Sequence, residues 1–202
     1  MQIFNLPNSL TLLRILLVPV FTYYFLNGSY RVALMVFVVT GMTDVIDGYL
    51  ARKLQKKTTL GSILDPAADK LLMLVTFIVL ALSRLVPAWL SALVIARDLV
   101  IVGGTLILKQ LKKRLYFKPT RLSKLNTFFQ LFTIFLAFLL TFLRAERPGF
   151  LLPYEGLVAR LLGWVIYVCA GMTVASGIQY TRIGIQILHA GREYADLPLK
   201  KD

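Results

Sequence analysis

The sequence predicts an all-α integral membrane protein with six transmembrane helices. Hydrophobic residues make up 57% of the 202-residue chain and charged residues only 16%, whereas soluble domains carry about 25% charged residues. The apolar residues also gather in runs of about 20, the length of helix that crosses the ~30 Å hydrocarbon core of a bilayer. We therefore expect a single membrane domain over residues 1–202.

Short breaker sequences divide the apolar runs into six spans. Asn27-Gly28-Ser29 predicts a tight turn after the first span, and Val86-Pro87 separates the third span from the fourth. Arg147-Pro148-Gly149 and Pro153 predict the loop before the sixth span. The expected spans are 8–28, 31–52, 63–84, 86–109, 122–144 and 155–182.

The positive charges predict how the spans are oriented. The second and fourth connections carry four and six Lys or Arg residues, and the first and third carry one each. Because cytoplasmic loops are enriched in Lys and Arg, we expect the even-numbered connections and both termini in the cytoplasm. Arg144 and Arg147 then lie on the outer side, where Glu146 and Glu155 offset part of their charge. The net charge of +13 suits anionic lipid rather than nucleic acid, since the cations lie in short loops between apolar spans.

Four aspartates lie in or at the ends of the second and third spans. Asp44 and Asp47 are three residues apart and Asp65 and Asp69 are four apart, so each pair shares a helix face. An ionised carboxylate inside a membrane is costly unless it is paired or bound to metal. The basic second connection makes the two helices antiparallel neighbours, which brings the four carboxylates together. Like charges so close need cations, and oxygen ligands suit Mg²⁺, Mn²⁺ or Ca²⁺.

Arg52 and three small residues accompany the aspartates. Arg52 lies one helical turn after Gly48, and a fixed guanidinium beside a metal cluster suits phosphate. Gly48, Ala51 and Gly61 have two open interpretations. They allow either close packing between helices or close approach of a base or a diphosphate to the backbone.

Charged residues elsewhere inside the spans are also open to two interpretations. Arg14, near the cytoplasmic end of the first span, either extends to the interface or contacts a lipid phosphate. Arg97 and Asp98 in the fourth span either neutralise each other or shape a cavity. The second interpretation is favoured, because a charge inside a span is otherwise costly.

The segment around the aspartates resembles a known family signature. Asp44-Val45-Ile46-Asp47-Gly48-Tyr49-Leu50-Ala51-Arg52, eight further residues, and Gly61-Ser62-Ile63-Leu64-Asp65-Pro66-Ala67-Ala68-Asp69 resemble the CDP-alcohol phosphotransferase pattern D-x-x-D-G-x-x-A-R-x8-G-x3-D-x3-D. All eight fixed positions are present at the right spacing. The resemblance implies a six-helix membrane enzyme, commonly a homodimer, with a polar cavity that opens to the cytoplasm.

The same resemblance implies roles for individual residues. Asp44, Asp47 and Asp65 are expected to ligate Mg²⁺ or Mn²⁺, as one ion or two. Asp69 is expected to be a shared ligand or the general base on the acceptor hydroxyl. The expected CDP-binding residues are Asp47, Gly48, Ala51, Arg52 and Gly61.

The implied reaction moves a phosphatidyl group from CDP-diacylglycerol to a glycerol-type alcohol and releases CMP. The implied location is a bacterial cell membrane or a mitochondrial-type membrane, with the active site facing the cytoplasm. Two acceptors are considered, phosphatidylglycerol, which would make cardiolipin, and glycerol-3-phosphate.

The start of the fifth span bears on the choice of acceptor. Glycerophosphate-using relatives typically show G-K-x-K-T, whereas this chain reads Ser123-Lys124-Leu125-Asn126-Thr127 and has Asp98 where those relatives usually carry glutamate. A phosphate monoester is nearly dianionic and benefits from two cations, whereas a diester carries one negative charge. We expect Lys124 and Arg121 to bind the acceptor phosphate, and phosphatidylglycerol is favoured over glycerol-3-phosphate.

Other classes of function compete with this interpretation. A transporter relays protons or ions through intramembrane aspartates, but a relay would spread carboxylates across the membrane depth, and here they gather near one face beside Arg52. A structural or partner-binding protein has no reason to keep four intact aspartates. Among enzymes, a relative that uses a soluble alcohol such as inositol phosphate or serine stays open.

Overall fold

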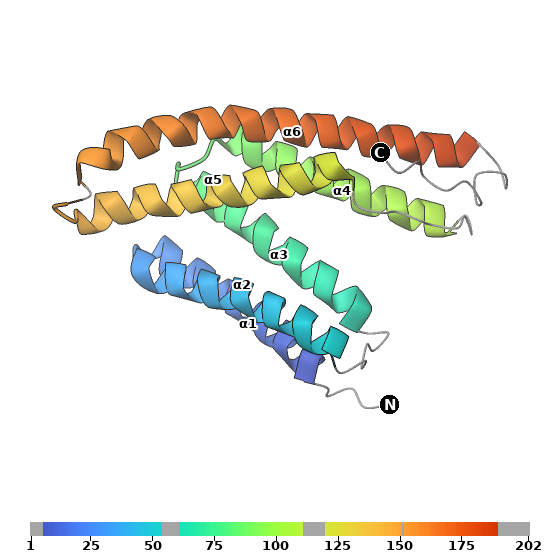
Figure 1. Cartoon of the computed structure of the whole chain (residues 1–202), viewed down its shortest axis with the longest axis horizontal. Coiled ribbons are helices and arrows are strands. Elements are labelled where there is room, and N and C mark those ends of the chain that lie inside the picture. The colour runs from blue at the N-terminus through green and yellow to red at the C-terminus, as the bar shows by residue number, and fades with distance from the viewer. Residues whose placement is uncertain (1–5, 54–60, 111–119, 151, 190–202) are drawn as a thin grey trace. The chain divides into compact units, whose positions relative to one another are not determined.

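The computed structural model describes residues 6–53, 61–110, 120–150 and 152–189, and side chains within 12–43, 70–108, 120–150 and 153–188. Its described residues form six α-helices and one short 3-10 helix, with no strand among them (Figure 1). The expected all-α architecture is therefore confirmed. The helices are α1 (Leu6–Leu26), α2 (Tyr30–Lys53), α3 (Gly61–Leu82), α4 (Ala88–Gln110), α5 (Arg121–Glu146) and α6 (Glu155–His189), with η1 (Leu152–Tyr154) before α6.

Three of the helices are long and apolar enough to cross a membrane, namely Ala88–Leu108, Arg121–Glu146 and Glu155–Leu188. The parts of α1, α2 and α3 whose side chains are described contribute shorter apolar stretches, Leu12–Leu26, Tyr30–Thr43 and Lys70–Leu82. The chain is thus a membrane protein with at least three candidate spans. The count of six spans stays a prediction.

The ends of α1 and α3 are closed by the same hydrogen-bond pattern. After α1, the backbone N–H of Ser29 donates to the carbonyl of Tyr24, and Gly28 adopts a φ of 77°. After α3, the N–H of Leu85 donates to the carbonyl of Leu80, and Arg84 adopts a φ of 56°. This is the left-handed helix ending that favours glycine. It confirms the predicted turn at residues 27–29, and it ends α3 before Pro87.

The helices pack as two compact units. Unit 1 comprises Met1–Ala88 and Ile134–Arg160, and unit 2 comprises Trp89–Thr133 and Leu161–Asp202. In unit 1, α1 packs against both α2 and α3. The core of unit 1 is aromatic: Phe21, Phe25, Phe37 and Phe138 lie with ring centroids 5.1–6.0 Å apart, distances typical of favourable aromatic pairs.

Charged residues of unit 1 pair at the end of the bundle near residues 144–155. Arg31 forms an ion pair with Glu146, and Nε of Arg144 donates to Glu155 at 3.0 Å. The expected offset is confirmed for Arg144, whose partner is Glu155, whereas Glu146 pairs with Arg31 of the first connection. By contrast, Arg14 is only 1% exposed. Protein therefore packs around this side chain, which argues against direct contact with a lipid phosphate. Extension of Arg14 toward the interface stays a prediction.

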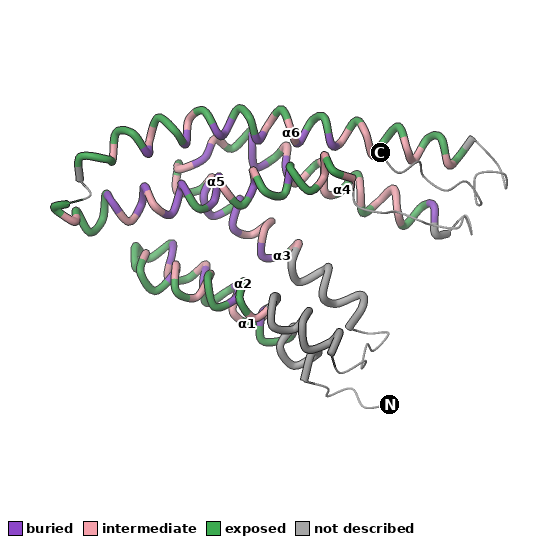
Figure 2. The backbone as a smooth tube through the Cα atoms, in the orientation of Figure 1, coloured by how far each residue is buried: buried purple, intermediate pink, exposed green. Residues whose placement is uncertain are grey.

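In unit 2 the buried face of α6 is a narrow stripe. Figure 2 shows buried positions recurring between exposed ones along this helix. The spacing is three or four residues, which is the period of one helix face. The buried residues are Leu162, Val165, Ile166, Cys169, Thr173 and Ser176. The C-terminal part of this stripe is polar, since it consists of Thr173 and Ser176. These two residues are therefore candidates for a functional role.

Candidate functional site

The eight signature positions lie on α2 and α3. Asp44, Asp47, Gly48, Ala51 and Arg52 fall in the last ten residues of α2, and Gly61, Asp65 and Asp69 fall in the first nine of α3. Their side chains lie outside the described residues. Residues 54–60 join these two helix ends, and a seven-residue link spans at most about 25 Å. The helical backbone confirms that Asp44 and Asp47, and Asp65 and Asp69, share helix faces, but the metal site itself stays a prediction.

The expected acceptor-binding residues lie in the first turn of α5. Thr120 caps this helix, because its hydroxyl accepts the N–H of Ser123 at 3.1 Å. The same hydroxyl donates to Oε1 of Gln179 on α6 at 2.9 Å. Arg121 and Lys124 are both exposed. The ammonium of Lys124 has no ion pair with any described residue, which leaves it accessible to an anionic ligand.

Arg97 on α4 connects three helices of unit 2. Its Nη1 donates to Oδ1 of Asp98 at 2.6 Å, and its Nη2 donates to the hydroxyls of Ser123 at 3.0 Å and Ser176 at 2.7 Å. The guanidinium also lies 5.7 Å from the ring centroid of Tyr180, within range of a cation–π contact. The Arg97 side chain is 9% exposed and that of Asp98 is 23% exposed. The two charges therefore neutralise each other, the alternative that the sequence favoured less.

A further interhelical hydrogen bond lies one turn further along α5. The hydroxyl of Thr173 on α6 donates to Oδ1 of Asn126 at 2.8 Å, and both side chains are fully buried. The contacts from Thr120 to Gln179, Ser123 to Ser176 through Arg97, and Asn126 to Thr173 advance three residues on α5 and go back three on α6. The two helices are thus antiparallel in a fixed register. We call the residues around the Arg97 and Asn126 contacts the polar seam. It consists of Arg97, Asp98, Ser123, Asn126, Thr173 and Ser176.

Two buried amide groups at the seam keep a donor unused. Nδ2 of Asn126 and Nε2 of Gln130 have no hydrogen-bond partner in the described part of the chain, although Asn126 is 0% and Gln130 4% exposed. Thr173 bonds the carbonyl oxygen of Asn126 and so does not serve its amide nitrogen. A lysine at this position would bring a buried charge without a partner.

Sequence reasoning singled out Ser123 and Asn126 but gave no role to Thr173, Ser176 or Gln130. A signal for them was present. Polar residues on α5 recur at 123, 126, 130 and 133, and on α6 at 173 and 176, with the three- to four-residue spacing of one helix face. A polar stripe inside two long apolar runs indicates that the runs face each other along it.

Comparison with known proteins decides the family. The model of the CDP-alcohol phosphatidyltransferase family matches residues 4–175. The chain belongs to the CDP-alcohol phosphatidyltransferase family. It is 34% identical over 192 residues to the CDP-diacylglycerol–glycerol-3-phosphate 3-phosphatidyltransferase of Bacillus subtilis, covering 88% of this chain and 93% of that protein.

Relatives named as cardiolipin synthases are about equally similar to this chain. It is 36% identical over 148 residues to the cardiolipin synthase (CMP-forming) of Rattus norvegicus, covering 64% of this chain. It is 35% identical over 194 residues to the cardiolipin synthase (CMP-forming) / mitochondrial hydrolase fusion protein of Schizosaccharomyces pombe, covering 89% of this chain. The chain spans 48% of the length of the first of these relatives and 31% of the second. Overall identity therefore does not separate the two acceptors.

Proposed function

We propose that this protein transfers a phosphatidyl group from CDP-diacylglycerol to phosphatidylglycerol, releasing CMP and forming cardiolipin. The observation that carries the transfer chemistry is the complete family signature on two helix ends, within a chain that the family model matches over residues 4–175. The choice of acceptor rests on the first turns of α5, and glycerol-3-phosphate is the second candidate because of the Bacillus subtilis relative.

In this proposal the residues of α2 and α3 handle the donor. Arg52 binds the diphosphate, and Gly48, Ala51 and Gly61 leave room for the cytidine and its phosphates beside the backbone. Asp69 accepts the proton of the acceptor hydroxyl. The acceptor oxygen forms a bond to the lipid-side phosphorus, and the bond from that phosphorus to the CMP oxygen breaks.

We also propose that Asp44, Asp47, Asp65 and Asp69 hold Mg²⁺ or Mn²⁺, as one ion or two. The donor set fits, since carboxylates supply only hard oxygen ligands and repeat at one-turn spacing on the two helices. When bound, the metal supplies neutralising charge for the diphosphate.

The polar seam favours phosphatidylglycerol over glycerol-3-phosphate as the acceptor. Asn126 occupies the position where glycerophosphate-using relatives typically carry a second lysine, and here it is a buried neutral amide held by Thr173. Lys124 therefore provides the nearby exposed cation, with Arg121 one turn earlier. With a neutral amide in place of the second lysine, the site carries one cation fewer, which suits the single negative charge of a phosphodiester better than a nearly dianionic monoester.

The proposal includes six membrane spans, both termini in the cytoplasm, a polar cavity on that side and a homodimer. The cation-rich second and fourth connections support this orientation. The ion pairs of Arg31 and Arg144 with glutamates support it too, because they reduce the net positive charge of the opposite side.

The test is an acceptor comparison with the purified protein. CDP-diacylglycerol and Mg²⁺ are supplied with either phosphatidylglycerol or glycerol-3-phosphate, and CMP release and lipid products are measured by mass spectrometry. Cardiolipin formation from phosphatidylglycerol is expected. Product from glycerol-3-phosphate alone would overturn the acceptor, and no CMP release with either would overturn the transfer reaction.

A further inference from the structure

Four arginines lie at the end of unit 1 where α1 ends and α2 begins. Figure 1 shows α1 and α3 side by side and running in the same direction, so α3 ends there too. The ion pair between Arg31 and Glu146 brings the end of α5 to the start of α2. Residues 27–31, 83–87, 144–150 and 152–155 contain no lysine, although about half of the chain's 23 Lys and Arg residues are lysines. We call their arginines the arginine-rich end, which consists of Arg31, Arg84, Arg144 and Arg147.

Glutamates neutralise only two of these arginines. Arg31 pairs with Glu146, and Arg144 pairs with Glu155. The same four segments contain no other acidic residue. The other two arginines are exposed and form no ion pair with any described residue. They are Arg84 and Arg147. Two guanidinium groups are therefore left for an anion from outside the chain.

The two arginines without a carboxylate partner also hold backbone conformations that favour glycine. Arg84 has a φ of 56° and Arg147 a φ of 43°, and no other non-glycine residue in the described part of the chain has a positive φ. The corresponding position after α1 is Gly28, with a φ of 77°. An L side chain is strained in this conformation, whereas glycine is not. Arginine at both strained positions indicates that the guanidinium groups serve a function there.

The chemistry of the surroundings specifies the anion. The candidate span of α5 ends at Glu146 and that of α6 begins at Glu155, so the connection between them lies at the depth of the lipid headgroups. Tyr154 in this connection is exposed, as is typical of tyrosines at the membrane–water interface. Phospholipid phosphates lie at this depth. A guanidinium donates two parallel hydrogen bonds to one phosphate, whereas the ammonium of lysine acts as a point charge. We propose that the arginine-rich end binds the phosphates of anionic phospholipids in the leaflet at this end of the chain.

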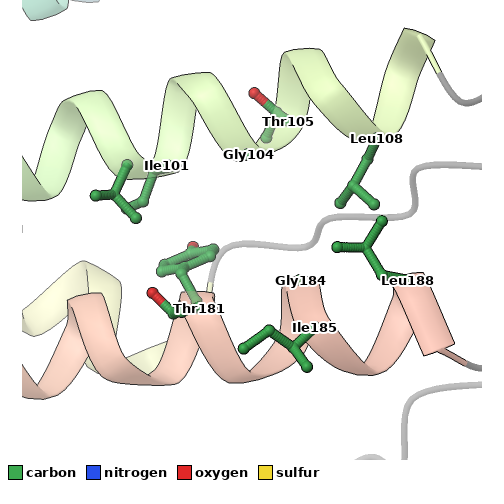
Figure 3. A pocket seen from close by; sticks show the side chains of 10 residues that line it. Ile101, Gly104, Thr105, Leu108, Thr181, Gly184, Ile185 and Leu188 are labelled. Atoms are coloured by element: carbon green, nitrogen blue, oxygen red, sulfur yellow. The ribbon is translucent and has the colours of Figure 1, made fainter.

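The apolar groove of unit 2 does not account for a preference between headgroups. It lies between α4 and α6, where Leu108 and Leu188 face each other and Gly104 and Gly184 lie on opposite walls (Figure 3). None of the residues that line it is charged. A lipid chain held in this groove would be retained whatever its headgroup. A preference for anionic over zwitterionic lipid therefore reports on the charged surfaces of the protein.

Replacing both strained arginines by glycine tests the proposal, because the change removes charge and relieves the backbone. The Arg84→Gly, Arg147→Gly double variant and the unaltered protein are purified from micelles with equal amounts of phosphatidylserine and phosphatidylcholine of the same chains. Phosphatidylserine is anionic but is not the proposed acceptor. Native mass spectrometry counts the retained lipids. We expect the double variant to retain at least one phosphatidylserine fewer and the same number of phosphatidylcholine molecules. Its melting temperature in phosphatidylcholine alone should equal or exceed that of the unaltered protein.

Gly28→Ala is the matched control, since Gly28 is the third left-handed position at this end and carries no charge. A Cβ atom there would meet nothing within 4 Å, so this variant adds backbone strain alone. It should lower the melting temperature and leave the phosphatidylserine count unchanged. The same loss of phosphatidylserine in Gly28→Ala would overturn the proposal, because strain rather than charge would then control lipid retention.

The single variants keep the test available if the double variant is poorly produced. Arg84→Gly and Arg147→Gly should each lower the occupancy of the retained phosphatidylserine about fivefold, because one cation near the membrane surface is lost. The signature positions lie at the other ends of α2 and α3, so the result does not depend on the proposed reaction. Unchanged phosphatidylserine retention in all three glycine variants would overturn the proposal and would assign the arginine-rich end to an acidic protein partner instead.

Discussion

The acidic helix ends of α2 and α3 and the polar seam of unit 2 both place polar residues in apolar helices, but they balance charge differently. The seam satisfies its charges internally, because Arg97 bonds Asp98 and two hydroxyls within the same unit. The aspartates of α2 and α3 repeat one sign of charge at one-turn spacing, which destabilises a helix by itself. The difference indicates that balanced polar residues hold helices together, whereas repeated like charges need a bound cation to balance them.

The largest expected effect separates activity from stability in the acidic region. Asp69→Asn should lower CMP release about 10²–10⁴-fold, because the general base is lost. Donor lipid should still bind. The melting temperature of the metal-free protein should stay the same or rise, since one of several like charges is removed. Turnover near that of the unaltered protein would remove Asp69 from the role of base.

In the seam the expected effect is on stability. Arg97→Leu should lower the free energy of unfolding by about 3 kcal/mol, because Asp98 and two hydroxyls lose their shared partner. Adding Asp98→Asn should recover part of that loss by removing the carboxylate charge that Arg97 balanced. Denaturant unfolding in detergent measures all three variants. If Arg97→Leu kept its stability but lost acceptor turnover, Arg97 would belong with the substrate-binding residues.

Much of the fold could be predicted because its signals are local. Asn27-Gly28-Ser29 sets where α1 ends, and Pro87 sets where α4 begins. The structure follows both signals within two residues. The sixth span was expected to end at 182. It continues to His189, because residues 183–188 contain no proline and only one glycine, so nothing local ends the helix there.

The interhelical contacts could not be predicted in the same way. Whether Arg97 points to its neighbour Asp98 or into a cavity depends on Ser123 and Ser176, which are 26 and 79 residues away in the chain. The burial of Arg14 likewise depends on how neighbouring helices pack around α1. Spacing along one helix indicates which residues share a face, but it does not indicate which other helix covers that face.

A smaller effect is expected at the exposed cation beside the seam. Lys124→Gln should raise the KM for the acceptor about tenfold and leave kcat nearly unchanged, because one charge-assisted contact to phosphate is lost. Arg160→Gln is the matched control, since Arg160 is also exposed on a helix and, among the described residues, bonds only the carbonyl of Gly156 in its own turn. A fall in kcat with KM unchanged would contradict the assigned role.

The smallest expected effect tests whether the seam is purely a structural device. Thr173→Val keeps the shape of the side chain but leaves Oδ1 of Asn126 buried without its donor, so the free energy of unfolding should fall by about 1–2 kcal/mol. Thr181→Val on the same helix should cost less than about 0.5 kcal/mol, because that hydroxyl is exposed and bonds its own backbone. Acceptor turnover should be unchanged in both variants. If Thr173→Val instead reduced turnover at full stability, the orientation of Asn126 would serve the acceptor, and the distinction between balanced and unbalanced polar residues would fail at this position.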